Sequence, residues 1–420
     1  MVNVGIVTTW FASGAGNVAK NYERALENKH QVFIYARGGM RAKHSPEWNQ
    51  SNVTWAPPHP CLTGIYAGHF GSWIKRHSID TVLFNEQRYW APIILARKLG
   101  VLVGAYVDYY TADTVPFFGL FDFLVCNTMR HYSVFRNHPQ CCFIPWGTQT
   151  DAFIPPVSAM ERPLTFITSA GWTGRNARLS PWMDRRGTGM VLKSFQRVQG
   201  NCRLVVFSQV PLNECPDEWK SAVQHDRRIE FLEGTFEPTP YSLGDVYVYP
   251  SRLDGIGLTL PEALSCGLPA IATDSAPMNE FVLNGENGVL IPVKEYHSRP
   301  DGYYWPEAIC DEEKLLDALN YYAQNPEAAR SHGKTARKRA EQYLSWSKNA
   351  GLLAEWIAGQ KIMSDRPGIR INELRLRAEQ FDRRYNPTPL ENILKSLLAY
   401  WQILNHENSL VKHQGSFRTR

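Results

Sequence analysis

Short apolar runs alternate with stretches of mixed apolar and polar residues through the first third of the chain. Each run is four to six residues long and rich in Val, Ile, Phe or Leu, and helix-type spacing of apolar residues follows two of them, over residues 17–27 and 91–99. Strands that alternate with helices predict a parallel sheet covered on both faces. The predicted strands are residues 4–7, 31–35, 81–84, 101–106, 123–126 and 142–145.

The alternation breaks over residues 145–156, where Pro, Trp and Gly predict a loop, and then begins again. Two α/β units joined by a short connection create a cleft, and ligands of such sheets bind at the carboxyl ends of the strands. The predicted strands of the second unit are residues 164–167, 203–207, 229–232, 246–249 and 270–272, and the predicted helices are residues 189–198, 314–322, 328–357 and 389–404.

The composition is that of a globular protein, because 44% of the 420 residues are hydrophobic and 20% are charged. The length indicates about two domains. The net charge is +5, and residues 365–420 hold ten Lys or Arg against six Asp or Glu, so +4 of it lies in this tail. A basic tail attracts phosphates or anionic lipid, but a tail that is simply solvated has the same composition.

Cysteine usage and hydropathy indicate the cytoplasm. None of the eight cysteines forms a Cys-x-x-Cys pair, and most lie in apolar surroundings, as in a reduced protein. The chain starts with a strand-like segment rather than a secretory signal, and no apolar run reaches the ~18 residues of a membrane span. We therefore expect a cytoplasmic protein, and leave peripheral contact with the inner face of the membrane open.

The segment over residues 247–263 carries the clearest chemical signal. A predicted strand ends at Pro250, a loop with Gly255 and Gly257 follows, and a helix is expected to begin near Leu260. Glycines let the backbone turn sharply and approach a ligand closely. The free N–H groups at the start of the helix then face the cleft, which predicts an anion site suited to phosphate.

Two carboxylates, Asp254 and Glu262, flank this predicted anion site. They would repel a phosphate unless they bind something else, and vicinal hydroxyls fit because an ionised carboxylate accepts two O–H hydrogen bonds. A ribose and a hexose on either side of a diphosphate would use both. A structural interpretation of Glu262 is also open, because Thr259 and Glu262 have the spacing of a capping box with Pro261 in the first turn.

The segment resembles the donor-binding signature of the retaining GT-B glycosyltransferases of family 4, the group 1 glycosyl transferases. That signature has an acidic residue, then Gly-Phe-Gly-Leu, and a glutamate eight positions after the first. Here Asp254 stands where Glu is usual, Ile256 stands where Phe is usual, and Glu262 matches. The likeness covers about residues 1–360 and is weakest over 1–140. Further matching positions are Gly244-Asp245, Pro250-Ser251, Gly267-Leu268-Pro269, Asp274, Glu280 and Asn287-Gly288.

The resemblance implies a role for each matching residue. Glu262 is expected to bind the ribose hydroxyls and Asp254 the hydroxyls of the transferred sugar, and with Asp108 they make up the predicted catalytic set. The side chain of Asp254 is one methylene shorter than the usual Glu. This difference is expected to change the contact geometry more than the reaction class. The residues expected to hold sugar and phosphate are Ser251, Gly255, Ile256, Gly257, Leu258 and Thr259.

Relatives also have a basic pair that contacts the diphosphate, in a Gly-Arg…Lys-Gly pattern. Arg186, followed by Gly187, fits the Lys-Gly part. Trp172 occupies the slot of the first Arg, and Arg175 is the expected substitute. A cation here offsets charge that builds on a leaving diphosphate. The competing interpretation is a solvated turn before a helix.

Two features of the first unit also match by position. Gly14 and Gly16 resemble the small-residue loop near the donor phosphate and the acceptor, although a Gly-x-Gly turn alone is a weak signal. Asp108 follows a buried strand where many relatives have a His that contacts the sugar. A structural turn is an equally good interpretation of Asp108, and Asn85-Glu86, at another strand end, is a similar candidate.

The fold that the resemblance implies is α/β with GT-B architecture, in which two Rossmann-like parallel-sheet domains face a cleft. Residues 1–155 are the expected acceptor domain and residues 160–340 the expected nucleotide-sugar donor domain. Residues 341–362 are expected to form a helix that crosses back to the first domain, and residues 363–420 a basic tail with a helix.

The function so implied is transfer of a sugar from a nucleoside-diphosphate sugar to an acceptor hydroxyl with retention, in glycan or polysaccharide synthesis. No cofactor beyond this co-substrate and no metal are expected, since the chain has no Asp-x-Asp motif and its His residues lack ligand spacing. The expected acceptor is a glycan, a lipid-linked glycan or another hydroxyl compound, and no nucleic-acid motif is present. The alternatives are a nucleotide-sugar sensor or scaffold without turnover, an epimerase and a phosphorylase.

Overall fold

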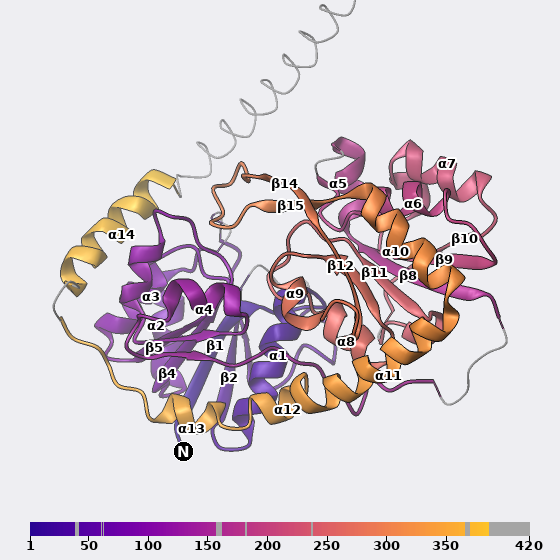
Figure 1. The fold of residues 1–420 in the computed structure, drawn as a ribbon. Helices are drawn as coiled ribbons and strands as arrows, with labels where there is room; N and C mark the ends of the chain where they lie inside the picture. The colour runs from indigo at the N-terminus through magenta and orange to yellow at the C-terminus, as the bar shows by residue number, and fades with distance from the viewer. Residues whose placement is uncertain are drawn as a thin grey trace, which may run out of the picture.

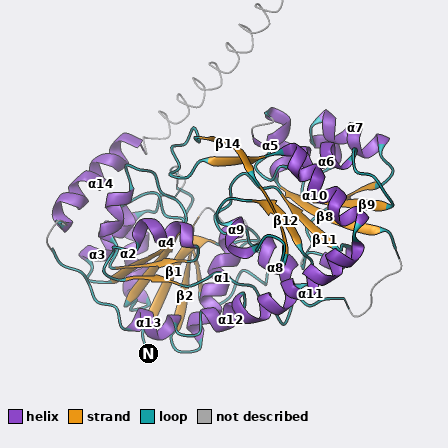
Figure 2. Cartoon of the chain, viewed as in Figure 1, coloured by secondary structure: helices purple, strands orange, loops and turns teal. Residues whose placement is uncertain are grey.

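The computed structural model describes residues 1–37, 42–59, 61, 63–156, 162–180, 183–236, 238–365 and 370–385. Its strands form two separate groups with helices on both faces of each (Figures 1 and 2). The predicted α/β class, with two parallel-sheet Rossmann-like domains, is confirmed.

The first sheet has seven strands in the order β3-β2-β1-β4-β5-β6-β7, all paired in parallel. Its central strands are buried on both faces, as expected for a covered parallel sheet. The strands are β1 (Asn3–Thr9), β2 (Gln31–Arg37), β3 (Val53–Trp55), β4 (Thr81–Asn85), β5 (Leu102–Tyr106), β6 (Phe123–Cys126) and β7 (Cys141–Phe143), and the helices are α1 (Gly14–Glu27), α2 (Ala67–Arg76), α3 (Ala91–Lys98), η1 (Val115–Leu120) and α4 (Met129–Phe135).

The second sheet has six strands in the order β10-β9-β8-β11-β12-β13, again all parallel. Its strands are β8 (Leu164–Gly171), β9 (Cys202–Ser208), β10 (Ile229–Glu233), β11 (Val246–Tyr249), β12 (Ala270–Thr273) and β13 (Gly288–Ile291). Its helices are α5 (Thr173–Leu179), α6 (Thr188–Phe195), η3 (Leu212–Glu214), α7 (Asp217–His225), η4 (Tyr241–Leu243), α8 (Thr259–Ser265), α9 (Met278–Phe281), α10 (Glu312–Gln324) and α11 (Pro326–Tyr343).

An antiparallel hairpin that the hydrophobic pattern did not predict leaves the second sheet. It consists of β14 (Val293–His297) and β15 (Glu307–Cys310). In Figure 1 the connection between these strands extends toward the first domain. An isolated bridge between Thr111 and Tyr303 ties it there.

The return to the first domain is not the single helix expected over residues 328–357. Helix α11 ends at Tyr343, and two short helices follow, α12 (Trp346–Asn349) and α13 (Leu353–Ala358). The helix breaks because the backbone there pairs with Thr148, whose N–H donates to Leu344 O at 2.7 Å and whose carbonyl accepts from Trp346 N at 3.0 Å. The indole N–H of Trp346 then donates to Asn21 O at 2.9 Å, which anchors the crossing segment on α1.

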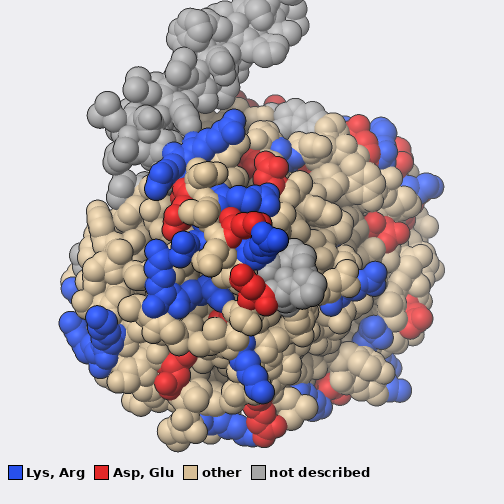
Figure 3. Space-filling model, turned by 90° about the vertical axis from the view of Figure 1, so that its left-hand side faces the viewer, with Lys and Arg blue, Asp and Glu red and all other residues tan. Residues whose placement is uncertain are grey.

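A further helix that was not predicted, α14 (Ile371–Tyr385), packs on the outer side of the first domain. Its Asp382 carboxylate accepts from the N–H groups of Trp90 and Ala91, at 2.8 and 3.0 Å, at the start of α3. The surface on this side carries Lys and Arg side chains with Asp and Glu among them, so its charge is mixed (Figure 3).

The tail helix predicted over residues 389–404, with Tyr400 and Trp401, lies outside the described residues, and contact of the tail with a membrane stays a prediction. In the part of the chain that the structure describes, none of the helices combines the length and the apolar character that a membrane span requires.

Candidate active site

The glycine loop after β11 is held by its own buried residues. Ser251 is fully buried, and its hydroxyl donates to Leu253 O at 3.2 Å. Ile256 is buried in the core, which fixes the middle of the loop. Gly257 has a φ of 81°, a conformation that favours glycine, whereas an added Cβ on Gly255 would meet nothing within 4 Å. Gly255 therefore marks open space at the turn.

Asp254 is held as an anion beside this loop. Its carboxylate accepts from the N–H of Gly257 at 3.1 Å and from the hydroxyl of Tyr249. Burial by itself would raise the pKa of Asp254, but the charges of Arg185 and Arg186 and the hydrogen bonds outweigh it and lower the pKa to about 2. Asp254 is therefore a fixed negative charge with strong hydrogen-bonding capacity.

Glu262, one turn into α8, has the opposite environment. Its carboxylate accepts from the hydroxyl of Tyr241 at 2.8 Å. Burial raises the pKa of Glu262 to about 7, against the opposing effects of Tyr241 and Arg186. The capping box is not formed. The Thr259 hydroxyl accepts a hydrogen bond from the hydroxyl of Tyr247 at 2.8 Å, and no side chain caps α8.

Three tyrosines that were not predicted thus support the motif, since Tyr249 contacts Asp254, Tyr247 contacts Thr259 and Tyr241 contacts Glu262. The rings of Tyr247 and Tyr249 stack with centroids 5.6 Å apart. The sequence could have indicated the shared position of Tyr247 and Tyr249, because residues two apart on a strand lie on the same face.

The basic pair lies against Asp254 rather than in a solvated turn. Arg186 Nη1 donates to the hydroxyl of Tyr249 at 2.9 Å, and Arg185 Nη1 lies 3.8 Å from the Asp254 carboxylate. Burial lowers the pKa of Arg186, but Tyr249 and Asp254 more than offset this, so its pKa lies above the ordinary value and it stays charged. Gly187 has a φ of 72°, and an added Cβ would lie 2.6 Å from Pro250 O, so the turn requires glycine.

Trp172 and Arg175 are not brought to this cluster. Trp172 is 58% exposed, and Arg175 Nε donates to the carboxylate of Glu214 at 2.7 Å on the surface. Arg175 therefore does not supply, in this structure, the cation expected from the first Arg of the Gly-Arg…Lys-Gly pattern.

The loop before α1 faces the glycine loop after β11 across the domain boundary. Ser13 caps α1 by accepting from Gly16 N at 3.1 Å, and an added Cβ on Gly16 would lie 2.1 Å from Phe11 O. An added Cβ on Gly14 would lie 4.0 Å from Leu258 Cδ1. The structure therefore brings the predicted small-residue loop to the Gly255–Leu258 turn.

Asp108, at the end of β5, is half-buried in a charged cluster. Burial, and then the charge of Glu86, raises the pKa of Asp108 to about 8, against the effects of Arg88 and Arg37. Glu86 itself has a φ of 52°, which is uncommon for a residue with a side chain. The raised pKa of Asp108 favours its protonated carboxyl, which can donate a hydrogen bond.

Tyr303, from the hairpin of the second domain, contacts the main chain of Asp108 in the first domain. Its hydroxyl donates to Asp108 O at 3.0 Å. Burial raises the pKa of Tyr303 to about 12, and Arg130 lowers it, while the charges of Asp108 and Asp254 both add to the rise. Tyr303 therefore links the hairpin of the second domain to the end of β5.

The sequence of the second domain matches a known family directly. Residues 173–299, which include Arg186, Asp254 and Glu262, match the family described as glycosyl transferases group 1. Over these residues the second domain is similar to that family.

Two curated enzymes are similar to this chain in sequence. A GDP-mannose-dependent alpha-(1-6)-phosphatidylinositol monomannoside mannosyltransferase of Mycolicibacterium smegmatis is 23% identical over 400 residues, which cover 85% of this chain and 98% of that enzyme. An alpha-maltose-1-phosphate synthase of the same organism is 28% identical over 172 residues, which cover 39% of this chain and 42% of that enzyme.

Solved structures confirm the GT-B fold of the chain. Sucrose-phosphate synthase from Thermosynechococcus elongatus is similar at a TM-score of 0.63 and 16% identity, over 84% of this chain and 98% of that chain. Anabaena HepE in complex with UDP and glucose is similar at a TM-score of 0.63 and 14% identity, over 86% of this chain and 100% of that chain.

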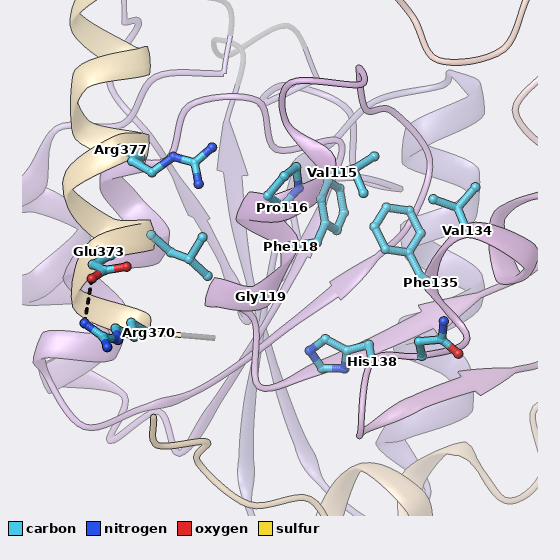
Figure 4. Close-up of a pocket in the computed structure, with 12 residues that line it drawn as sticks. Val115, Pro116, Phe118, Gly119, Val134, Phe135, His138, Arg370, Glu373 and Arg377 are labelled. Carbon is cyan, nitrogen blue, oxygen red and sulfur yellow. Dashed lines mark hydrogen bonds and ion pairs between the residues drawn. The ribbon is translucent and has the colours of Figure 1, made fainter. Parts of the chain in front are cut away.

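The first domain also has a cavity of about 400 Å³ that is separate from the residues above. It lies between η1, the end of α4 and α14, and Phe118, Phe135, Leu374 and Arg377 are among its walls (Figure 4). None of the predicted site residues lines it. Among the described residues, no three or more His, Cys, Asp or Glu side chains are grouped as a metal would require.

Proposed function

We propose that this chain transfers a sugar from a nucleoside-diphosphate sugar to an acceptor hydroxyl, with retention of configuration and without a metal ion or cofactor. The observation that carries the proposal is the pair Asp254 and Glu262, which flank one glycine turn with pKa values of about 2 and about 7. Two carboxylates in such different environments, with Arg185 and Arg186 beside one of them, suit hydroxyl recognition on both sides of a diphosphate.

Each residue then has a defined role. Glu262 accepts hydrogen bonds from the ribose hydroxyls, and Asp254 accepts them from hydroxyls of the transferred sugar. The open space at Gly255 lets the sugar and phosphate approach the backbone. Arg186, with Arg185, offsets the charge on the leaving diphosphate in place of a metal ion.

The first domain supplies the acceptor side of the cleft. Gly14 leaves room for the donor phosphate, Gly16 lets the loop pack closely against Phe11 O, and Asp108, whose raised pKa favours the protonated carboxyl, donates to the transferred sugar or the acceptor. Closure of the cleft excludes water and favours transfer over hydrolysis. The acceptor that we propose is a glycan or a lipid-linked glycan, in line with the phosphatidylinositol monomannoside in the name of the mycobacterial relative.

The names of relatives suggest which donors to try first. GDP-mannose is the donor named for the mycobacterial enzyme, and UDP is bound in the Anabaena structure and in that of a pneumococcal O-GlcNAc transferase. A thermal-shift screen should therefore begin with GDP, UDP, GDP-mannose, UDP-glucose and UDP-GlcNAc. A ligand at about 100 times its dissociation constant stabilises by roughly 2.7 kcal/mol, which is easily measured.

The screen compares the wild type with Glu262→Ala, and with Glu218→Ala on the exposed surface of α7 as the control. A shift with one nucleotide in the wild type and the control, but not in Glu262→Ala, supports the donor site and identifies the base. No shift with any ligand would contradict the proposal. Binding without turnover would favour a sensor or scaffold, and consumption of donor without an acceptor would favour an epimerase. NMR of the product then reads its anomeric configuration, and inversion would contradict the retaining mechanism.

A further inference from the structure

Helix α4 of the first domain is docked end-on against the second domain. The N–H groups of Met129 and Arg130 donate to the two carboxylate oxygens of Glu280, in α9, at 2.6 and 3.0 Å. The first turn of α4 is thereby joined to the segment that follows β12, next to the donor loop.

The side chain of Arg130 continues across the same boundary. It is only 5% exposed, and its Nη1 donates to Ala276 O at 2.7 Å. Its Nη2 donates to the backbone carbonyl of Asp254. Both acceptors belong to the second domain, so one guanidinium of the first domain joins the donor loop to the segment before α9.

We propose that Arg130 is a positioning residue for the donor sugar, which orients Asp254 and the Gly255 peptide when the two domains are closed. This inference rests on the proposed function. Holding the Asp254 carbonyl fixes the peptide plane that leads into Gly255, whereas the Asp254 carboxylate is held separately by Tyr249 and Gly257. Because Arg130 comes from the first domain, this orientation is complete only while the cleft is shut.

The hairpin of the second domain covers Arg130 and strengthens the closed arrangement. The Arg130 guanidinium lies over the Trp305 ring at 5.7 Å, and the indole N–H of Trp305 donates to the hydroxyl of Tyr110 at 2.7 Å. The rings of Tyr109 and Tyr303 stack nearly parallel with centroids 5.1 Å apart. These contacts keep water from the guanidinium, which makes its hydrogen bonds to the donor loop stronger than they would be in solvent.

The test compares Arg130→Met and Arg130→Lys with Arg136→Met, a matched control at the exposed end of the same helix. For the donor found in the screen, we expect kcat to fall by about 100-fold in Arg130→Met, as for a displacement of about 1 Å in the reacting group. The dissociation constants of GDP and UDP should change much less than kcat, because Glu262 and Arg186 lie in the second domain. Arg130→Lys should recover part of kcat, since an ammonium reaches one of the two carbonyls.

A second measurement is independent of turnover, namely hydrogen exchange at the amides of residues 255–258. Arg130→Met should lose protection there, and Arg136→Met should not. A merely structural role would instead lower the melting temperature and raise exchange through both domains. Unchanged kcat and unchanged local protection in Arg130→Met would overturn the proposal. If the wild type itself turns over no nucleotide sugar, the proposed function fails, and local exchange alone decides whether Arg130 orders the loop.

Discussion

The hydroxyl of Tyr241 donates a 2.8 Å hydrogen bond to the carboxylate of Glu262, in surroundings where burial raises the pKa of Glu262 to about 7. Only the ionised carboxylate accepts hydrogen bonds from two ribose hydroxyls at once. With a pKa of 7, the ionised fraction grows from about a tenth at pH 6 to about nine tenths at pH 8. The dissociation constant of a nucleotide sugar should therefore fall roughly tenfold over this range, as measured by calorimetry.

The matched control is Glu262→Gln, whose affinity should be weaker and independent of pH. A nucleotide sugar is the right ligand because it lacks the terminal phosphate ionisation of a free nucleoside diphosphate. Asp254, with a pKa of about 2, stays ionised throughout and adds no slope. Equal pH dependence in wild type and Glu262→Gln would show that another group titrates.

The two glycines of the loop should respond differently to alanine. Gly257→Ala should cost about 1–2 kcal/mol of stability, because its φ of 81° disfavours a Cβ. Gly255→Ala should leave the stability of the free protein unchanged, since a Cβ there meets nothing within 4 Å. Gly255→Ala should nevertheless weaken nucleotide-sugar binding if the ligand fills that space. Chemical unfolding and calorimetry on both variants separate the effects, and normal binding by Gly255→Ala would place the sugar elsewhere.

Arg186 and Arg175 provide a matched pair of arginines. Arg186→Met should weaken nucleoside-diphosphate binding by about 1.5–3 kcal/mol, as for a lost charged hydrogen bond, and should affect the nucleoside alone much less. Arg175→Met should bind normally, because the Arg175 side chain pairs with Glu214 on the surface. Equal losses in the two variants would mean that Arg175 moves to the diphosphate when the donor binds.

The local pattern of residues was sufficient to predict the two sheets and the glycine loop between β11 and α8. Residues 246–249 were predicted as a strand and form β11, and the glycine loop and short helix follow as expected. The same alternation places Tyr247 and Tyr249 on one face, so their contact with the motif could have been inferred. Helix α14 also had a signal, because Ile371, Leu374, Ala378 and Phe381 have helical spacing and pack on the first domain.

Contacts between distant segments could not be predicted in this way. Tyr109 and Tyr303 stack across 194 positions of the chain, and the hairpin that carries Tyr303 is rich in polar and aromatic residues without a clear period. The sequence around Arg130 shows only a basic residue near the start of a helix, and its contact with Glu280 of the other domain could not be predicted from it. The prediction of one continuous helix over residues 328–357 was wrong for the same reason, because the backbone on either side of Ser345 is hydrogen-bonded to Thr148.

The attachment of α14 should depend on Asp382, which ties the helix to the start of α3. Its carboxylate accepts from the N–H groups of Trp90 and Ala91, where a negative charge is also favoured by the helix dipole. Asp382→Ala should therefore cost about 1–2 kcal/mol, by the measure of lost helix caps. Gln380→Ala, at an exposed position of the same helix, should cost almost nothing.

Thermal unfolding measures the expected loss of stability, and limited proteolysis measures the attachment of α14. We expect Asp382→Ala to melt about 2–4 °C below the wild type and to be cut faster within residues 370–385. The proposed donor site is remote from this contact, so nucleotide affinity should not change. Faster cleavage without a lower melting temperature would mean that α14 adds nothing to the stability of the first domain. A loss of nucleotide affinity would instead mean that α14 acts on the cleft through η1 and α4, which form the other walls of the cavity beside it.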